Sequence, residues 1–406
     1  MDIRVLLLLA LEALFALWLL YRSGLLNTAP RLVFSVLLIL AAFTLRALCI
    51  DYQTLDYKNF LSHWVAFYRE NGGFRSFSYP LGNYNIPYMY FLCLFSYLPI
   101  WDLYLIKLLS IFFDVLLAYA SMRLLRTVKQ DETALLACFF VILFLPTVIL
   151  NGSLWGQCDS IYVALAVLAV ACAMEDRPIL SVLYFTLSFG FKLQAVFLLP
   201  ILLVFWFRKQ MKFWHFLLFP VFYVILVLPA VALGKPFLET LTLYASQTGS
   251  IGDGLNYNSP SIFAIFWHVQ NAETASALGI AGAFTWLAAL LLFAFFRRDR
   301  LNDRAVLALL LLMAVGIPFL LPHMHDRYFF PADVLSVVFA FACPICFAAA
   351  PLTQFASLLG YHAYLKMRYL LYMDHGSRAL IGVLLLAFGR LLWETREPGP
   401  AEIAKN

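Results

Sequence analysis

Long apolar runs constrain this chain more than any other feature of its sequence. The runs at 5–21, 32–50 and 278–296 carry almost no charge and are each long enough to cross the hydrocarbon core of a bilayer. Of all residues, 64% are hydrophobic and 13% are charged, whereas a soluble domain carries about 25% charged residues. Because helices satisfy their own backbone hydrogen bonds in lipid, we predict an all-α polytopic membrane protein.

The apolar runs divide the chain into a series of candidate membrane spans. The first run contains Glu12 and is followed by Arg22 without a small-residue cleavage motif, so it is expected to remain as a helix. A further span fits within 350–372. We therefore predict one membrane domain over residues 1–406 with about 11–13 spans. The candidate spans are 3–21, 31–50, 103–122, 134–149, 158–174, 178–190, 194–207, 213–233, 276–297, 303–321, 327–349 and 378–395.

Basic residues gather at the ends of these spans. Threading the spans in order places four basic clusters on one side of the membrane, which the positive-inside rule assigns to the cytoplasm. The clusters are Arg22 with Arg31; Arg123, Arg126 and Lys129; Arg208, Lys209 and Lys212; and Arg297, Arg298, Arg300 and Arg304.

Most of the unusual polar residues fall on the opposite side. They lie in the first outer loop at 51–102, at 150–157, at a break between two short apolar segments at 191–193, in an outer loop at 234–275, and at 322–326. Loops are polar in any membrane protein, but polar clusters that converge on one side of a helical bundle indicate a site there.

The first outer loop contains two candidate catalytic carboxylates. Aromatic residues from Phe60 to Tyr68 recur at helical spacing, which predicts a surface helix, and the run 88–98 predicts a second. Asp56 stands at the start of the first helix, where it is either an N-cap or a general base that accepts a proton from a sugar hydroxyl. Asp51 is the other candidate, unless it pairs with Arg46 or only marks the interface.

Four motifs in this order resemble those of known membrane glycosyltransferases. Asp56-Tyr57 followed by His63-Trp64 resembles the first-loop motif of the ER glucosyltransferases that use dolichyl-phosphate-glucose, with one extra residue before His-Trp. The other three resemble bacterial membrane glycosyltransferases and PIG-M-type mannosyltransferases. They read NGSLWGQCDS at 151–160, FKLQ at 191–194 and HMHDRYFFP at 323–331. The chain from about residue 50 to about 340 therefore resembles the glycosyltransferase superfamily of fold type C.

The resemblance implies a polyprenyl-phosphate-sugar donor, inversion at the anomeric carbon, transfer at the outer or lumenal face, and an aspartate base in the first outer loop. It assigns the base to Asp56 and the donor phosphate to Lys192 and Arg327, with His325 as an assisting candidate. The residues predicted to bind substrate are Asp51, Gln157, Asp159, Gln194, His323 and Asn258.

Several of these residues have a structural alternative. Lys192 stands between two apolar half-helices, so its ammonium could reach the interface instead of a phosphate. Asp159 could cap a helix, orient substrate hydroxyls or hold Lys192 in place. Lys107 and Asp114 share one face of a predicted span, where a buried charge is costly unless it is paired. We interpret both as structural, paired with each other indirectly or with a neighbouring helix.

Two further features are left open by the sequence. His323 and His325 have the spacing of a metal-ligand pair, but no third ligand is evident, so no metal and no cofactor are predicted. The glycine-rich segment 247–261, which contains Asn258, is predicted as a lid over the sugar site or part of the acceptor pocket, with a plain connecting loop as the alternative.

We therefore predict a hexosyltransferase that uses a polyprenyl-phosphate-linked sugar and a glycan or lipid-linked acceptor. The sequence contains no glycine-rich strand-to-helix turn of the kind that binds nucleotide sugars, and no basic patch that indicates nucleic-acid binding. A transporter or flippase is the alternative, although no internal repeat supports it. We expect a monomer among membrane lipids, with a bacterial cytoplasmic membrane favoured and the ER membrane as the eukaryotic alternative.

Overall fold

The computed structural model describes residues 2–247, 254–266 and 268–397. In these residues the fold is all-α apart from one pair of two-residue strands, and every predicted span contains a helix. The chain forms two compact units. Unit 1 comprises residues 1–199 and 213–253, and unit 2 comprises residues 200–212 and 254–406. Each unit is described separately.

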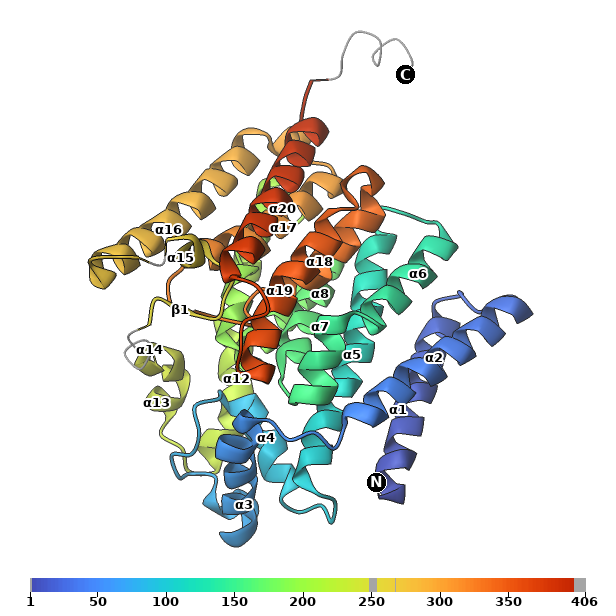
Figure 1. The fold of residues 1–406 in the computed structure, drawn as a ribbon, viewed down its shortest axis with the longest axis vertical. Helices are drawn as coiled ribbons and strands as arrows, with labels where there is room; N and C mark the ends of the chain where they lie inside the picture. The colour runs from blue at the N-terminus through green and yellow to red at the C-terminus, as the bar shows by residue number, and fades with distance from the viewer. Residues whose placement is uncertain (1, 248–253, 267, 398–406) are drawn as a thin grey trace. The chain divides into compact units, whose positions relative to one another are not determined.

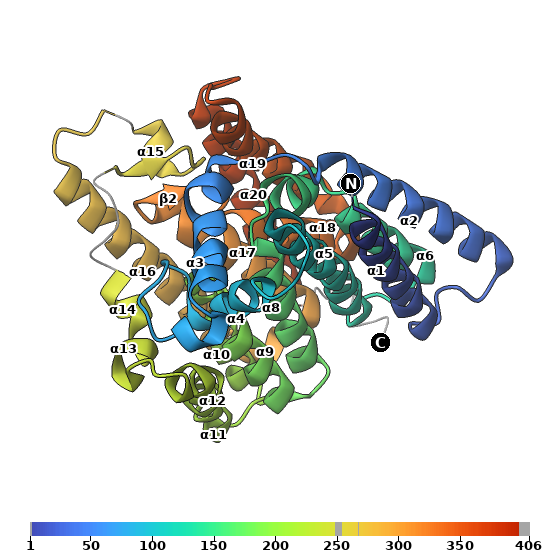
Figure 2. The same cartoon turned by 90° about the horizontal axis from the view of Figure 1, so that it is seen from below.

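Unit 1 consists of helices in its described residues. Helix α5 is its longest helix, and α1, α6 and α8 pack along it (Figures 1 and 2). Its helices are α1 (Ile3–Arg22), α2 (Ala29–Cys49), η1 (Tyr57–Leu61), α3 (Ser62–Glu70), η2 (Gly73–Ser76), α4 (Ile86–Phe95), α5 (Asp102–Arg126), α6 (Glu132–Leu143), α7 (Pro146–Ile149), η3 (Leu150–Trp155), α8 (Asp159–Met174), α9 (Pro178–Phe191), η4 (Leu193–Phe197), α11 (Phe213–Phe216), α12 (Leu218–Ala232), α13 (Phe237–Leu241) and α14 (Leu243–Gln247).

The core of unit 1 lies around α8. Apart from Asp159, Ser160 and Tyr162 near its start, this helix is apolar. All positions from Asp159 to Met174 are buried, and α5 and α9 pack against the helix. A helix that is apolar on all sides needs neighbours, or lipid, on all sides. Helix α8 therefore provides the fixed support from which the polar residues at its N-terminal end project.

Two breaks in unit 1 fall where polar motifs interrupt apolar sequence. The predicted span 134–149 bends by 43° between α6 and the segment 146–155, next to Pro146. Proline cannot donate the helical hydrogen bond, so a bend at this point is expected. The predicted break at 191–193 is confirmed, because α9 ends at Phe191 and Lys192 is extended, with φ −153° and ψ 133°.

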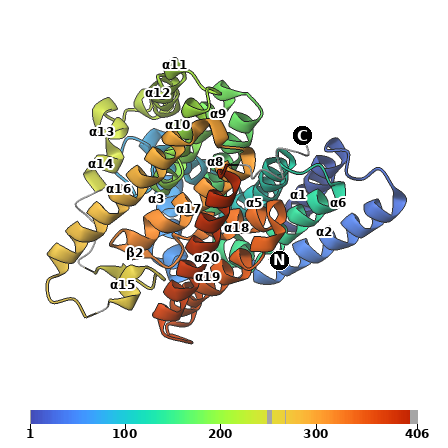
Figure 3. The same ribbon diagram turned by 90° about the horizontal axis from the view of Figure 1, so that it is seen from above.

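Unit 2 consists of helices with one short parallel strand pair. Helices α17, α18, α19 and α20 pack side by side, and α16 packs on α17 (Figure 3). The strand pair joins Asn256 to Met324 and Tyr257 to His325. The elements are α10 (Ile201–Phe207), β1 (Asn256–Tyr257), α15 (Ile262–Ile265), α16 (Ala272–Phe296), η5 (Arg298–Arg300), α17 (Asp303–Leu320), β2 (Met324–His325), α18 (Phe330–Ala342), η6 (Pro344–Cys346), α19 (Ala349–Lys366) and α20 (Met373–Glu394).

Seven helices of the described chain are long and apolar enough to cross a membrane, or eight if the bent pair at 132–155 is one span. The remaining predicted spans contain shorter apolar helices of 10–17 residues, among them α8, α9 and α18. The protein is therefore an all-α polytopic membrane protein. Both helices predicted in the first outer loop are present, one as η1 and α3 and the other as α4.

Within each unit, one polar contact joins the segments that carry two of the predicted basic clusters. In unit 1, Arg126 donates to the backbone oxygen of Ser23 at 2.9 Å, which brings the end of α5 to the turn between α1 and α2. In unit 2, Arg208 pairs with Asp303 at 2.7 Å, which brings the end of α10 to the start of α17. Two pairs of clusters that lie far apart in sequence therefore share one end of their own unit.

Candidate functional site

The turn between η3 and α8 organises the polar site of unit 1. The π-helical segment η3 ends at Gly156, which adopts φ +80°, a left-handed conformation that favours glycine. The backbone then doubles back, and Gln157 N–H donates to Asn151 O at 3.0 Å. Ser110 of α5 donates to Gln157 O at 2.7 Å and fixes the turn against that helix.

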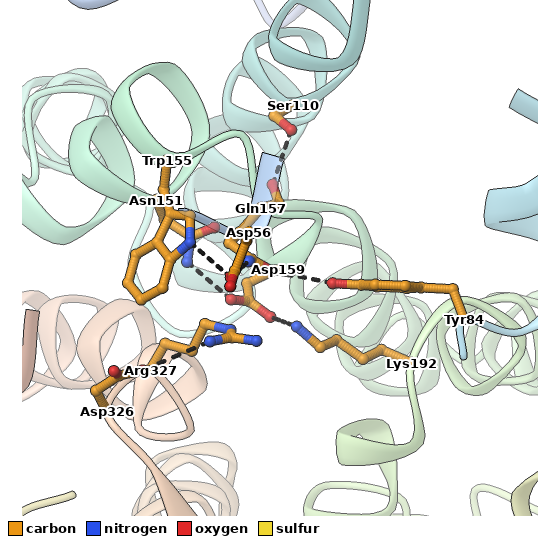
Figure 4. A network of polar contacts seen from close by, with 10 residues as sticks. All are labelled: Asp56, Tyr84, Ser110, Asn151, Trp155, Gln157, Asp159, Lys192, Asp326 and Arg327. Carbon is orange, nitrogen blue, oxygen red and sulfur yellow. Dashed lines mark hydrogen bonds and ion pairs between the residues drawn. The ribbon is translucent and has the colours of Figure 1, made fainter. Parts of the chain in front are cut away.

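Asp56 is held by this turn through one carboxylate oxygen. Its Oδ2 accepts hydrogen bonds from Trp155 Nε1 at 2.9 Å and from Gln157 Nε2 at 2.7 Å (Figure 4). Its Oδ1 accepts no hydrogen bond from any residue in the described part of the chain. The side chain is half-buried. The arrangement fixes the carboxylate and leaves one oxygen able to accept a proton.

The N-cap alternative for Asp56 is contradicted. The Asp56 side chain makes no capping hydrogen bond to η1. Thr54 takes that role, because its hydroxyl accepts from Tyr57 N–H at 3.4 Å while donating to Trp155 O at 3.2 Å. A capping group two residues earlier therefore releases the Asp56 carboxylate for the contacts described above.

Asp159 and Lys192 form a buried ion pair at the start of α8. Lys192 Nζ contacts Asp159 Oδ1, and Asn151 Nδ2 donates to Asp159 Oδ2 at 2.7 Å (Figure 4). Lys192 Nζ also lies 5.9 Å from the centre of the Tyr162 ring. Of the alternatives for Asp159, holding Lys192 in place is the one that these contacts match.

A tyrosine from the first outer loop reaches the same turn. Tyr84 donates its phenolic hydrogen to Gln157 Oε1 at 3.1 Å (Figure 4). The Gln157 amide therefore accepts from Tyr84 and donates to Asp56, and it is 2% exposed. The Gln157 amide therefore links Asp56 and Tyr84, the two ends of the segment 56–84, although it lies 73 positions after Tyr84.

A second buried ion pair lies next to the turn between η3 and α8. Arg46 of α2 contacts Asp114 of α5 at 3.1 Å, and both side chains are fully buried. Ser160 donates to the other oxygen of Asp114 at 2.5 Å. A Cβ atom at Gly152 would lie 3.0 Å from both Asp114 oxygens, so glycine allows η3 to approach this carboxylate. The prediction that Asp114 is paired within the fold is confirmed.

Further polar contacts hold the N-terminal half of α5 against the segment that precedes and follows Asp51. Lys107 Nζ donates to the backbone oxygens of Cys49 at 3.1 Å and Tyr52 at 2.6 Å, so carbonyl oxygens rather than Asp114 hold its ammonium. Tyr57 donates to Asp102 at 2.9 Å. Burial, with the neighbouring Asp102 carboxylate, raises the pKa of the Tyr57 phenol, which keeps it a hydrogen-bond donor.

Asp51 lies apart from the contacts around Asp56. It is exposed and accepts a hydrogen bond from the Tyr104 phenol at 2.7 Å. The alternative that it pairs with Arg46 is wrong, because Arg46 contacts Asp114 instead. Gln194, on η4 just after Lys192, has a buried Oε1 that accepts no hydrogen bond from the described residues, which suits its predicted role as a substrate contact.

The predicted residues of unit 2 gather around its strand pair. Arg327 lies 3.5 Å from Asp326, and both side chains are largely buried. The His325 imidazole stacks on the Tyr257 ring with a centroid distance of 4.7 Å and an interplanar angle of 12°. The strand pairing of residues 257 and 325 explains this stack, because directly paired residues project on the same face of a sheet.

His323 and Asn258 make contacts within unit 2 that shape its loops. His323 Nδ1 lies 2.8 Å from Gly254 O, and its Nε2 lies 3.3 Å from the Ser276 hydroxyl. Asn258 Oδ1 accepts from the Tyr369 phenol at 2.5 Å. Residues 248–253 of the predicted lid lie outside the described residues. No three histidine, cysteine, aspartate or glutamate side chains meet as a metal-ligand group in the residues that the structure describes.

Sequence reasoning missed three residues of the unit 1 site as functional candidates. Asn151 and Trp155 belong to the motif at 151–160, yet only the π-helical turn shows that their side chains reach Asp159 and Asp56. Tyr84 carries no motif at all, and its contact with Gln157 spans 73 positions. The sequence offers one signal for this residue: Tyr84 directly precedes Asn85-Ile86-Pro87, where helix α4 begins.

A substitution at Gly156 tests whether this turn sets up the site. Gly156→Ala forces an L-residue to φ +80°, which costs about 1–2 kcal/mol, although a Cβ there meets only ordinary contacts at 3.5 Å. Gly24→Ala is the matched control, because its φ is +73° with nothing within 4 Å of the added Cβ. We expect a similar loss of stability on thermal unfolding in detergent for both variants, and a loss of transferase activity for Gly156→Ala alone. Equal activities would contradict the role of the turn.

The comparisons with known proteins identify one family. The family model described as glycosyltransferase family 87 matches residues 83–322, more than half of the chain. The match covers the turn at 151–160, Lys192 and the segment up to the strand β2. No curated protein matches the chain in a sequence search.

Proposed function

Because the chain belongs to glycosyltransferase family 87, we propose that it transfers a hexose with inversion from a polyprenyl-phosphate-sugar donor. The proposed acceptor is a glycan, glycolipid or cell-envelope component at the outer or lumenal membrane face. The observation that carries the proposal is the Asp56 carboxylate, held at Oδ2 by Trp155 and Gln157 with Oδ1 left as a proton acceptor.

The proposed step begins with the acceptor hydroxyl. Asp56 Oδ1 takes its proton as the hydroxyl oxygen forms a bond to the anomeric carbon. The bond from that carbon to the phosphate oxygen breaks, and polyprenyl phosphate leaves with the bonding electrons. Because the acceptor attacks the face opposite the phosphate, the configuration at the anomeric carbon inverts. The two hydrogen bonds at Oδ2 hold the base in one orientation during this step.

Lys192 is proposed to neutralise the departing phosphate. Its ammonium has three donors, and Asp159 engages it from one side. Asn151 fixes the second oxygen of Asp159, so the lysine is held by a carboxylate that cannot rotate freely. A fixed cation stabilises the charge that develops on the leaving phosphate without reorganising first. Gln194 is proposed to contact the donor. Arg327 and His325 of unit 2 remain predicted phosphate ligands on the resemblance of their motif alone.

A lipid-linked donor suits the depth of the unit 1 site. Ser110, which holds the turn, lies eight residues into α5, about 12 Å along the helix from its start. A phosphate carried on a polyprenyl chain reaches this depth from within the bilayer. In the described residues the only strands are two residues long, so no strand-to-helix phosphate cradle is formed there.

The donor class can be tested with purified protein in detergent. A panel of short-chain polyprenyl-phosphate hexoses is supplied with an acceptor extract, and release of polyprenyl phosphate is measured. We expect release with one hexose. Transfer of sugar to the acceptor from nucleotide sugars, without any release from the polyprenyl-phosphate hexoses, would overturn the proposal. The stereochemistry of the product, read by the anomeric coupling in NMR spectra, tests inversion separately. Accumulation of donor across vesicles without release would favour the transporter alternative.

The phosphate role of Lys192 predicts a specific pattern of rescue. Lys192→Met should lower transfer about tenfold to a hundredfold, because a charge-assisted contact to the phosphate is lost. It also removes the Lys192 partner of the buried Asp159 carboxylate, which destabilises the fold. Adding Asp159→Asn should restore stability on thermal unfolding but not transfer. Recovery of transfer in the double variant would show that Lys192 only balances Asp159.

A further inference from the structure

One face of α5 carries a second polar cluster at the end away from Asp102. Tyr119, Met122, Arg123 and Arg126 are spaced as i, i+3, i+4 and i+7, so their side chains project on one face of the helix. With Glu175, which follows α8, and Arg177, which precedes α9, they line a pocket of about 370 Å³. Every one of these residues belongs to unit 1.

The pocket has an excess of positive charge. Its lining holds three arginines and a single carboxylate, Glu175. Arg123 engages that carboxylate through two hydrogen bonds of 2.8 and 2.5 Å. Arg177 lies 3.9 Å from the same carboxylate with 60% of its side chain exposed. One glutamate therefore balances one guanidinium closely, and the lining carries a formal excess of two positive charges.

Most of the guanidinium donors in this pocket remain available to a ligand. Arg126 uses Nη2 to bond Ser23 O at 2.9 Å, and Arg177 makes no side-chain hydrogen bond with the described residues. Each guanidinium carries five N–H groups in a planar fork that matches the oxygens of a phosphate. The Tyr119 ring and the Met122 thioether supply apolar surface beside these donors.

The position of the pocket sets it apart from the candidate active site. Helix α5 has 25 residues and is about 37 Å long, with Asp102 at one end and Arg126 at the other. A helix of that length crosses the hydrocarbon core, so its last turn lies where lipid headgroups lie. The pocket is therefore at the opposite bilayer boundary from the loop that holds Asp56.

We propose that this pocket binds the phosphate of an anionic phospholipid headgroup. Arg126 and Arg177 donate to the phosphate oxygens, Arg123 adds charge while paired with Glu175, and Tyr119 and Met122 contact the glycerol and upper acyl region. Basic pockets between membrane helices recognise lipid headgroups by this chemistry. The ion pair of Arg123 with Glu175 keeps the pocket open by joining α5 to α8.

The test is a titration of the full chain in neutral detergent with fluorescent phosphatidylglycerol, and separately with fluorescent phosphatidylcholine. We expect phosphatidylglycerol to bind at least about tenfold more tightly. Arg177→Gln should weaken it about threefold to tenfold, because one charge-assisted phosphate contact is removed. Arg378→Gln is the matched control, since its side chain is 63% exposed and pairs with an aspartate in unit 2. It should leave the affinity unchanged.

Each other result overturns the proposal. Equal affinity for the two lipids, or equal effects of the two substitutions, removes the pocket as an anionic-lipid site. Competition by inorganic phosphate at the concentration of the lipid shows that a free phosphate group is the ligand. Arg177 is exposed and loosely paired, so its substitution leaves the protein folded, and a thermal unfolding curve verifies this for both variants. Transferase activity is not the readout, so this test is independent of the proposed function.

Discussion

Hexose transfer should fall by about a thousandfold when Asp56 is replaced by asparagine. General base catalysis contributes about 10²–10⁴ in rate, and an amide does not accept the proton from the acceptor hydroxyl. Asparagine has the same shape as aspartate, so its carbonyl oxygen can still accept the hydrogen bonds from Trp155 and Gln157. Release of polyprenyl phosphate under single-turnover conditions measures the loss.

Asp51→Asn is the control for this substitution. Asp51 belongs to the same outer loop but is exposed, and its contact is with Tyr104 rather than with the turn. We expect its transfer rate to remain within about threefold of the wild type, because exposed polar contacts contribute little. If Asp51→Asn abolishes transfer while Asp56→Asn retains it, the base is assigned to the wrong carboxylate. Melting curves in detergent establish that both variants are folded.

The all-α membrane fold could be predicted because helices that cross lipid need long apolar runs, and such runs are visible in the sequence. Helices lie in every predicted span, and the charge clusters meet within each unit. The number of full-length spans could not be predicted in the same way. Helix α8 has only 16 residues, yet all of them are buried and the helix packs against α5 and α9, so protein contacts stabilise it.

The structure was needed to decide between the structural and functional roles that the sequence allows for Asp56 and Asp159. An aspartate before a helix favours an N-cap by composition alone, and at Asp56 this is wrong because Thr54 supplies the capping oxygen. The same composition argument applies to Asp159, whose carboxylate instead contacts Asn151 and Lys192. Local sequence reports which residues are suited to a cap, but not which of two neighbours takes it.

Contacts between distant segments could not be predicted from the sequence, for a different reason. Gln157 meets Tyr84 across 73 positions, and no periodicity relates the two. In the predicted loop 234–275 the described residues form short helices and a strand, and the pairing of Tyr257 with His325 depends on a register that apolar patterning does not encode. The roles of His323 and Asn258 as substrate contacts remain predictions, with loop-shaping contacts now assigned to both side chains.

The buried pair of Arg46 and Asp114 should have the largest effect on stability. Arg46→Met leaves the Asp114 carboxylate buried without its cation, which costs about 3–5 kcal/mol in the free energy of unfolding. Arg31→Met is the matched control on the same helix, because Arg31 pairs with Glu132 while 30% and 45% of the two side chains are exposed. Its cost should be below about 1 kcal/mol. Unfolding by sodium dodecyl sulfate in mixed micelles measures both.

The double variant Arg46→Met with Asp114→Asn separates charge from packing. Asparagine removes the uncompensated charge and can still accept from Ser160, so most of the lost stability should return. If the double variant is as unstable as Arg46→Met alone, packing of the Arg46 side chain rather than charge holds the helices together. Asp114 also lies against Gly152, in the turn that positions Trp155 and Gln157. Transfer should therefore recover along with stability, because the carboxylate at 114 supports the Asp56 site through the backbone of that turn and not through its charge.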